Sequence, residues 1–153
     1  MALQPGDPAP DFEGITTDGS RVSLKGYRGR KLVLYFYPMD DTPGCTKQAC
    51  SLRDANADIA AKGAAILGVS AQKQESHQHF TEKHRLNFPL LVDTEQEVAK
   101  RYGATGSGLL GAALGMFGMN KRITFIIDEE GRIARVIDRP DTAGHGEEVL
   151  KAL

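Results

Sequence analysis

The sequence predicts an α/β fold in which helices flank a mixed central β-sheet. Apolar, strand-like segments alternate with helical segments through most of the chain, a pattern typical of parallel strands joined by right-handed crossovers. A β-hairpin follows this alternating part and is expected to add antiparallel strands to the same sheet. The 153 residues are expected to form a single domain (1–153), which is long enough to bury a substantial core.

The chain is predicted to begin with a hairpin that precedes the alternating part. Residues 12–24 (FEGITTDGSRVSL) contain two short alternating runs around Asp18-Gly19, a dipeptide favoured in tight turns. Residues 31–37 (KLVLYFY) then form a nearly continuous apolar and aromatic run. Such a run is typical of a strand that is buried on both faces of the sheet.

The middle of the chain predicts two helices around a second buried strand. Residues 42–61 carry apolar side chains at helical spacing, and Gly63 supplies the stop. Residues 64–70 (AAILGVS) form another strand-like apolar run, and residues 71–84 are polar and helical.

The last part of the chain predicts three strands and two helices. The strands are expected at 88–93, 122–128 and 132–138, with residues 129–131 (EEG) joining the last two as a hairpin. The helices are expected at 94–103, with Thr94 as N-cap and Gly103 beyond the end, and at 144–153. This order, with its extra N-terminal hairpin, fits a thioredoxin-like fold.

Composition narrows the class of function. The net charge of -1 gives no reason to expect nucleic acid or an anionic membrane as a partner. The longest apolar run, residues 109–119, is shorter than the roughly 20 residues of a membrane span. The N-terminal residues show no export signal, so a cytoplasmic location is expected. Paired cysteines in that compartment are more often catalytic, redox-active or metal-binding than structural.

Both cysteines lie where the helix 42–61 begins. Thr42 is a good N-cap, Pro43 suits the first helical position, and Gly44 allows a close approach to the backbone. Cys45 then falls in the first turn, where free N–H groups and the helix dipole stabilise a thiolate.

Two acids precede this helix and would oppose a thiolate at its start. Asp40 and Asp41 lie close to Cys45 in sequence, so a cation is expected to balance them. Arg122, at the start of the strand 122–128, is the candidate, although only the fold could bring it near.

The spacing of the cysteines restricts how they can react. In an unbroken helix, Cys50 would lie about 7.5 Å along the axis from Cys45 and point in a different direction. That separation exceeds the limit of roughly 7 Å between Cα atoms for a disulfide. Joining the two thiols therefore requires the first turn or more of the helix to unwind.

The same residues resemble a known family. The pattern P-x-x-x-T-x-x-C, formed by Pro38, Thr42 and Cys45, resembles the active-site signature of peroxiredoxins. The longer run YFYPMDDTPGCTKQACSLRD resembles the peroxiredoxin Q group, also called bacterioferritin comigratory proteins. The segment KRITFIIDEEGRI matches a later family segment, and it places the family's arginine at Arg122. The opening GDPAPDF also matches, so the resemblance covers nearly the whole chain.

The resemblance implies a thiol-dependent peroxidase of the atypical two-cysteine kind. It implies that Cys45 attacks hydrogen peroxide or an organic hydroperoxide, and that Cys50 resolves the sulfenic acid as an intrachain Cys45–Cys50 disulfide. Thioredoxin or a similar dithiol would then restore both thiols, and no metal or other cofactor is implied. The substrate-binding residues would be Cys45 together with Pro38, Thr42, Gly44 and Arg122, with Pro38 shielding the thiolate.

Two departures from the family pattern stand out. Gln48 occupies a position where many peroxiredoxins carry a glutamate that helps to hold the arginine. Residues 104–120 are more apolar and glycine-rich than the usual connection before the arginine strand. This segment has a structural and a functional interpretation. It is either a connection packed on the body of the protein, or a functional apolar surface, which would be a wall beside Cys45 or a site of self-association. A monomer is expected, with a weak dimer as the alternative.

Two other functions compete with a peroxidase. A thioredoxin-like disulfide carrier would need Cys-x-x-Cys, which the spacing here does not provide. A non-enzymatic metal-binding module would need histidines beside Cys45 and Cys50, and the four histidines are all expected on solvated surface: His77, His79, His84 and His145. Arg53 is expected either to support the cysteine site or to pair with a nearby acid; the sequence favours neither.

Overall fold

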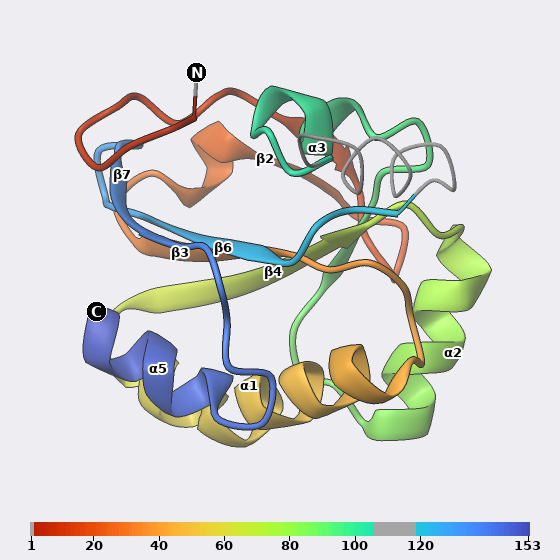
Figure 1. Cartoon of the computed structure of the whole chain (residues 1–153). Helices are drawn as coiled ribbons and strands as arrows, with labels where there is room; N and C mark the ends of the chain where they lie inside the picture. The colour runs from red at the N-terminus through yellow and green to blue at the C-terminus, as the bar shows by residue number, and fades with distance from the viewer. Residues whose placement is uncertain (1, 106–118) are drawn as a thin grey trace.

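A five-stranded mixed sheet forms the centre of the protein. The computed structural model describes residues 2–105 and 119–153. The strand order is β5-β4-β3-β6-β7, with β3, β4 and β5 parallel and β6 and β7 antiparallel to their neighbours. This arrangement confirms the predicted fold class (Figure 1). The strand bounds are β3 Lys31–Phe36, β4 Ala64–Ser70, β5 Leu90–Val92, β6 Ile123–Ile127 and β7 Ile133–Ile137.

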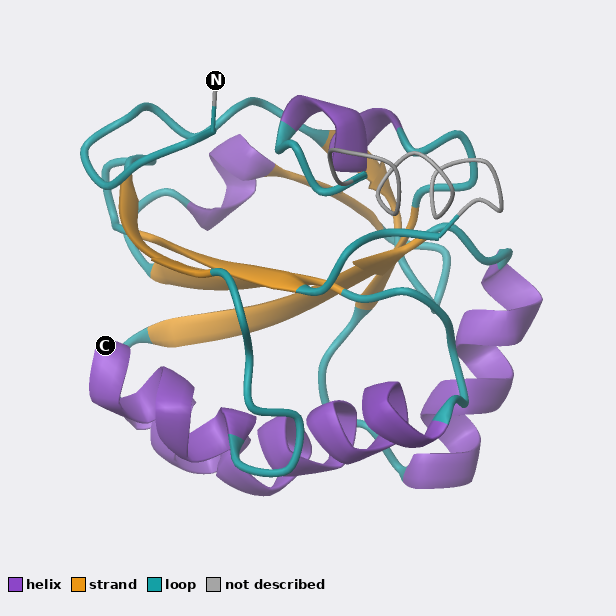
Figure 2. Ribbon diagram, viewed as in Figure 1, coloured by secondary structure: helices purple, strands orange, loops and turns teal. Residues whose placement is uncertain are grey.

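Helices cover both faces of this sheet. Figure 2 shows the long helix α1 and the shorter helix α5 along one face, with the N-terminal hairpin and the short helix α3 over the other. The helix bounds are η1 Leu24–Tyr27, α1 Pro43–Ala61, α2 Gln74–His84, α3 Glu97–Arg101 and α5 His145–Ala152. No helix in residues 2–105 and 119–153 is long and apolar enough to cross a membrane.

The central strand β3 separates two hydrophobic cores because its side chains alternate between the faces. Leu32, Leu34 and Phe36 belong to the core beneath the hairpin and α3. Val33 and Tyr35, together with Tyr37 just after the strand, belong to the core beneath α1, α2 and α5. All six side chains are buried, which explains the unbroken apolar run in the sequence.

The N-terminal hairpin forms as predicted. Strands β1 (Glu13–Ile15) and β2 (Arg21–Ser23) pair antiparallel, and Gly19 in the turn between them has φ +84°. That left-handed conformation favours glycine. An isolated bridge from Thr16 to Leu91 ties the hairpin to the edge strand β5.

Two helix starts were predicted too early. Helix α3 begins at Glu97, three residues later than expected, and Thr94 is not its cap. The carboxylate of Asp93 instead accepts hydrogen bonds from the N–H groups of Val98 and Ala99, at 3.1 and 3.0 Å. Asp93 satisfies the free N–H groups of the helix start, which is the role the sequence suggested for Thr94. The polar helix expected at 71–84 likewise begins at Gln74.

Close contact between α1 and α5 fixes the middle of α1 in place. A Cβ atom at Gly146 would lie 2.5 Å from the Ser51 carbonyl oxygen, so only glycine permits this approach. The Gly146 N–H also donates to the Ser51 hydroxyl at 2.8 Å. The part of α1 that follows Cys50 is therefore anchored to α5, whereas the first turn lies before this contact.

Candidate active site

Cys45 is the third residue of α1 and is almost fully buried, with 1% of its surface exposed. The first helical bond runs from the Thr46 N–H to the Thr42 carbonyl at 2.8 Å. The N–H groups of Gly44 and Cys45 precede that bond, so they are among the free donors of a helix start. The sulfur therefore lies at the positive end of the helix dipole, in surroundings that stabilise an anion.

The sheet register brings Arg122 to this sulfur. Ile123 pairs with Phe36, the last residue of β3, so the residue before Ile123 lies beside the loop that leads into α1. The Arg122 Nη2 donates to the Cys45 Sγ at 3.3 Å. Its Nη1 donates to the Gln48 Oε1 at 2.6 Å. A cation beside the sulfur stabilises the thiolate. Such a cation was expected near Cys45 from the sequence, and the structure places Arg122 there.

Gln48 holds the guanidinium without adding a negative charge. The side chain is fully buried one turn after Cys45, and its amide nitrogen has no hydrogen-bond partner among the described residues. A glutamate here would neutralise part of the Arg122 charge. The amide therefore orients Arg122 and leaves its charge available to the sulfur.

Gly44 permits the guanidinium to approach. A Cβ atom at Gly44 would lie 3.2 Å from the Arg122 Nη2, closer than ordinary contact. We predict that Gly44→Ala lowers the rate constant for Cys45 oxidation by peroxide about tenfold, because the guanidinium must move off its donor position. Stability should change little, since alanine is the better helix former. Stopped-flow peroxide kinetics and urea unfolding measure the two effects.

A glycine elsewhere provides the matched control. Gly26, in η1 on the other face of the sheet, has only the Ser23 hydroxyl near its Cβ position, at 3.8 Å. Gly26→Ala should leave the oxidation rate constant unchanged. If Gly44→Ala behaves like this control, Gly44 does not set the position of Arg122.

Thr42 occupies the N-cap position, but its side chain does not cap the helix as the sequence suggested. Its hydroxyl instead donates to the Met39 carbonyl at 3.1 Å. With its proton used there, the oxygen retains lone pairs that can accept a further hydrogen bond. Pro38 is half-buried at the start of the same loop, and its carbonyl accepts from the Gln72 amide at 3.4 Å.

The buried acid before the helix is directed away from the sulfur. Asp40 accepts hydrogen bonds from the Tyr37 hydroxyl at 2.5 Å and from the Ser76 hydroxyl at 2.7 Å. The Nδ1 of His77 lies 2.7 Å from the same carboxylate. These partners compensate the buried charge of Asp40 locally and fix the loop that carries Pro38 and Thr42.

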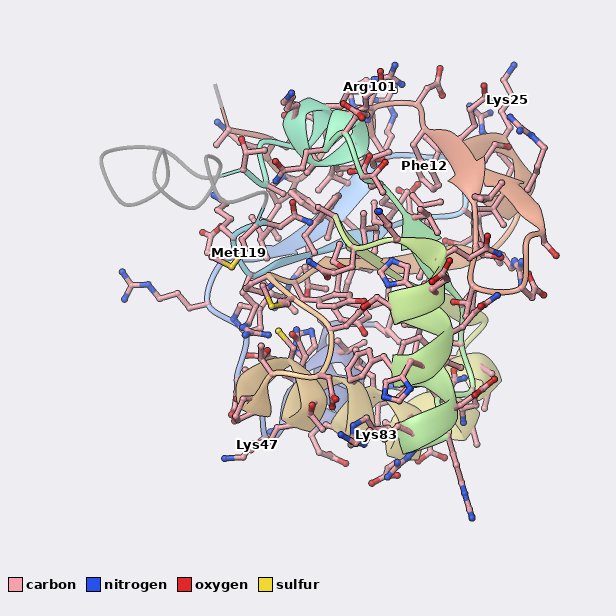
Figure 3. The ribbon with its side chains drawn as sticks, turned by 90° about the vertical axis from the view of Figure 1, so that its right-hand side faces the viewer. Phe12, Lys25, Lys47, Lys83, Arg101 and Met119 are labelled. Atoms are coloured by element: carbon pink, nitrogen blue, oxygen red, sulfur yellow. The ribbon has the colours of Figure 1, made fainter. Side chains whose placement is uncertain are left out.

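The second acid makes an exposed ion pair with α2. Asp41 contacts the Lys83 Nζ at 2.9 Å and the His84 Nε2 at 3.1 Å. The hydrogen bond from Lys83, followed by that from His84, holds the pKa of Asp41 below its ordinary value. Figure 3 shows Lys83 on α2 on the side that faces α1. Neither acid therefore opposes a thiolate as directly as the sequence implied.

The expectation that all four histidines lie on solvated surface was wrong for His77 and His145, which are fully buried. The His77 ring bridges Asp40 and the Leu91 carbonyl, and its spacing of three residues from buried Phe80 was a signal of a shared inner face. His145 lies 2.7 Å from the Glu148 carboxylate and 2.9 Å from the Thr124 hydroxyl.

These histidines do not form a metal site. Burial lowers the pKa of His145, an effect that the hydrogen bond to Glu148 opposes. Within the described ranges, no three histidine, cysteine or acidic side chains are grouped so that they could hold a metal ion.

Cys50 lies on a different side of α1 and is partly exposed, and both thiols are free. The helix is continuous from residue 43 to 61, so Cys50 cannot reach Cys45 without local unwinding. Arg53, whose role the sequence left open, contacts both candidate partners: its Nη1 lies 3.6 Å from the Cys50 Sγ, and its Nη2 pairs with Asp54 at 2.9 Å.

The sequence-predicted residues thus lie in three places. The structure brings Thr42, Gly44, Cys45 and Arg122 together at the start of α1. Pro38 lies at the beginning of the preceding loop, and Cys50 lies outside this group. Residues 106–118, which include most of the apolar segment 104–120, lie outside the described residues.

Comparisons with known proteins agree with this geometry. The model of the AhpC/TSA family matches residues 5–136. Peroxiredoxin Bcp of Bacillus subtilis (strain 168) is 41% identical over 162 residues, covering 100% of this chain and 96% of the relative. The crystal structure of peroxidoxin BcpB from Mycobacterium tuberculosis is similar with a TM-score of 0.84 and 32% identity, covering 98% of this chain and 96% of that one.

A third similar protein has a described activity. It is the bacterioferritin comigratory protein of Xanthomonas campestris, with a TM-score of 0.82, 29% identity and coverage of 92% of this chain and 88% of that one. Trapped intermediate and ligand complexes of that protein have been solved to give insight into its alkyl peroxide reduction activity.

Proposed function

The chain belongs to the AhpC/TSA family and is a peroxiredoxin, a thiol-dependent peroxidase, and from this premise we propose that Cys45 is the residue that attacks the peroxide. One observation carries the proposal: the buried Cys45 sulfur lies at a helix start, 3.3 Å from the Arg122 guanidinium. Both features stabilise the thiolate, which is the nucleophilic form of cysteine.

In the first step, the Cys45 thiolate attacks one oxygen of the hydroperoxide. The S–O bond forms as the O–O bond breaks, and the second oxygen leaves, taking up from solvent the proton that the thiol released on ionisation, to give water or an alcohol. Arg122 and the free N–H groups at the start of α1 stabilise the charge that develops on the oxygens. The Thr42 oxygen accepts the hydrogen bond of the peroxide and orients it, and Pro38 limits access of water to the thiolate.

In the second step, Cys50 resolves the sulfenic acid within the same chain. Its sulfur attacks the Cys45 sulfur, the S–S bond forms, and the sulfenic oxygen leaves as water. The beginning of α1 unwinds to allow this contact, because the intact helix keeps the two Cα atoms too far apart. A dithiol, most simply thioredoxin, then reduces the disulfide by thiol exchange.

The remaining assignments follow from this chemistry. Both reacting thiols belong to one chain, so a monomer is sufficient for the full cycle. Hydrogen peroxide and organic hydroperoxides are the proposed substrates, and the alkyl peroxide reduction described for the Xanthomonas campestris relative supports the second class. Dependence on a dithiol reductant fits the reducing conditions of the cytoplasm.

A peroxide titration with mass mapping tests the proposal. One equivalent of peroxide should remove two hydrogens per chain and link Cys45 to Cys50. Cys50→Ser should still consume one equivalent, stop at a Cys45 sulfenic acid and fail to turn over with thioredoxin. A disulfide carrier would not consume peroxide at a thiol-dependent rate. A stable sulfenic acid in the unaltered protein would show that Cys50 does not resolve it.

A further inference from the structure

The side chain of Arg53 has a position that the family chemistry at Cys45 does not explain. It follows Cys50 by one helical turn, and its Nη1 donates to the Cys50 Sγ at 3.6 Å. We propose that Arg53 is a catalytic residue of the resolving step, which stabilises the Cys50 thiolate as it attacks the sulfenic acid. This inference rests on the proposed function, in which Cys50 is the resolving thiol.

Two contacts hold the guanidinium beside this sulfur. The Arg53 Nη1 donates to the His84 carbonyl at 2.6 Å, at the end of α2, and its Nε donates to Asp54 at 3.0 Å. The side chain is 30% exposed, so solvent screens its charge only partly. Hydrogen bonding to Asp54 raises the pKa of Arg53 above its ordinary value; burial opposes this rise, and the neighbouring Cys50 sulfur adds to it.

The other charges around Cys50 are mostly negative, so a cation beside the sulfur has charges to offset. Cys50 lines a groove of about 510 Å³ between α1 and α5, and three acids line the same groove: Asp54, Asp58 and Glu147. Asp54 is paired with Arg53 itself, whereas Asp58 and Glu147 contribute negative charge to the groove and disfavour a further negative charge on the Cys50 sulfur. Lys47 also lines the groove, but its side chain extends into solvent (Figure 3). Arg53 donates directly to the sulfur and so opposes the acids.

The chemistry requires this assistance at neutral pH. The thiolate is the attacking form, and a free cysteine, with a pKa of about 8.5, is mostly protonated at about pH 7. With Arg53 in place, the Cys50 thiolate attacks the Cys45 sulfenic sulfur, the S–S bond forms and the S–O bond breaks. Hydroxide leaves and takes up the proton that Cys50 released to solvent. Electrons balance, because the two thiol sulfurs supply the pair that reduced the peroxide.

A purely structural role for Arg53 predicts the opposite effect. Its bond to the His84 carbonyl ties α1 to α2, so it could simply restrain the unwinding that resolution requires. Loss of the side chain would then accelerate disulfide formation. If Arg53 stabilises the thiolate, loss of the side chain slows it, so the sign of the change separates the two roles.

The test measures single-turnover disulfide formation by rapid quench and mass spectrometry. Arg53→Met should slow this step about tenfold at about pH 7 and leave the rate of Cys45 oxidation unchanged. Because the Cys45 sulfenic acid then persists for longer, excess peroxide should oxidise more of it to sulfinic acid. Raising the pH should narrow the difference between the variant and the unaltered protein, because thiolate formation then depends less on a neighbouring cation.

Two further variants separate the effect of the Arg53 charge from the effect of its bond to the His84 carbonyl, which could alter folding. Arg53→Lys retains the charge and should restore most of the rate, whereas Arg53→Gln keeps a donor for the His84 carbonyl but should remain slow. Arg135→Met, at an exposed position on β7, is the matched control. If Arg53→Met or Arg53→Gln resolves as fast as the unaltered protein, or faster, the inference is overturned. If the unaltered protein forms no Cys45–Cys50 link, the proposed function fails instead.

Discussion

Replacing Arg122 by methionine should lower the rate constant for peroxide oxidation of Cys45 by about 100- to 1000-fold. The guanidinium donates directly to the buried sulfur at 3.3 Å, so its loss destabilises the thiolate and, in the proposed mechanism, removes the positive charge that faces the breaking O–O bond. Arg122→Lys keeps the charge but cannot contact the sulfur and Gln48 together. Its rate constant should lie between those of the unaltered protein and Arg122→Met. Stopped-flow competition with a reference peroxidase gives the rate constants.

The stability of the variant must be measured alongside. Arg122→Met leaves the buried Gln48 carbonyl oxygen without its 2.6 Å partner, which should cost about 1–3 kcal/mol of unfolding free energy. Urea denaturation checks this, and Arg135→Met, with an exposed side chain on β7, controls for loss of an arginine. A folded Arg122→Met protein with an unchanged rate constant would remove Arg122 from the peroxide step.

Oxidation to the disulfide should abolish hydrogen-exchange protection at the beginning of α1. The rise of about 7.5 Å between Cys45 and Cys50 cannot be spanned by a disulfide while the helix is intact. Amides from about residue 46 to 50 should therefore exchange at least about a hundredfold faster after one equivalent of peroxide. Residues after Ser51 should stay protected, because the close contact with Gly146 anchors that part of the helix.

The control is Cys50→Ser treated with the same peroxide, which forms no disulfide and should keep a protected helix. Exchange followed by NMR, or by mass spectrometry after digestion, resolves the two halves of α1. Equal protection of residues 46–50 in the reduced and disulfide forms would contradict the unwinding step.

The sequence predicted the fold because its signals are local. The apolar run at 31–37, the turn at Asp18-Gly19 and the stop at Gly63 depend on backbone preferences and on burial that short segments already express. The start of α3 was misplaced because local signals did not suffice there. Asp93 and Thr94 are both good capping residues, and only the fold shows that Asp93 caps the helix.

What the sequence by itself determined is the position of Cys45 at a helix start, through Thr42, Pro43 and Gly44, and the five-residue step to Cys50 that prevents a disulfide in the intact helix. Both follow from helix geometry, which a short segment expresses without its surroundings. The pairing of Arg122 with Cys45, 77 residues apart, was proposed from charge balance and family resemblance, but its distance follows from the register of β3 and β6.

Only the tertiary structure decided the partners of Asp40 and Arg53. Asp40, in the loop before α1, is held by His77, and Arg53, on α1, is held by the carbonyl of His84, so both contacts depend on how α2 packs beside α1 and that loop. Hydrogen bonds act over about 3 Å, and segments more than 30 residues apart reach that distance only when the sheet and its covering helices pack together.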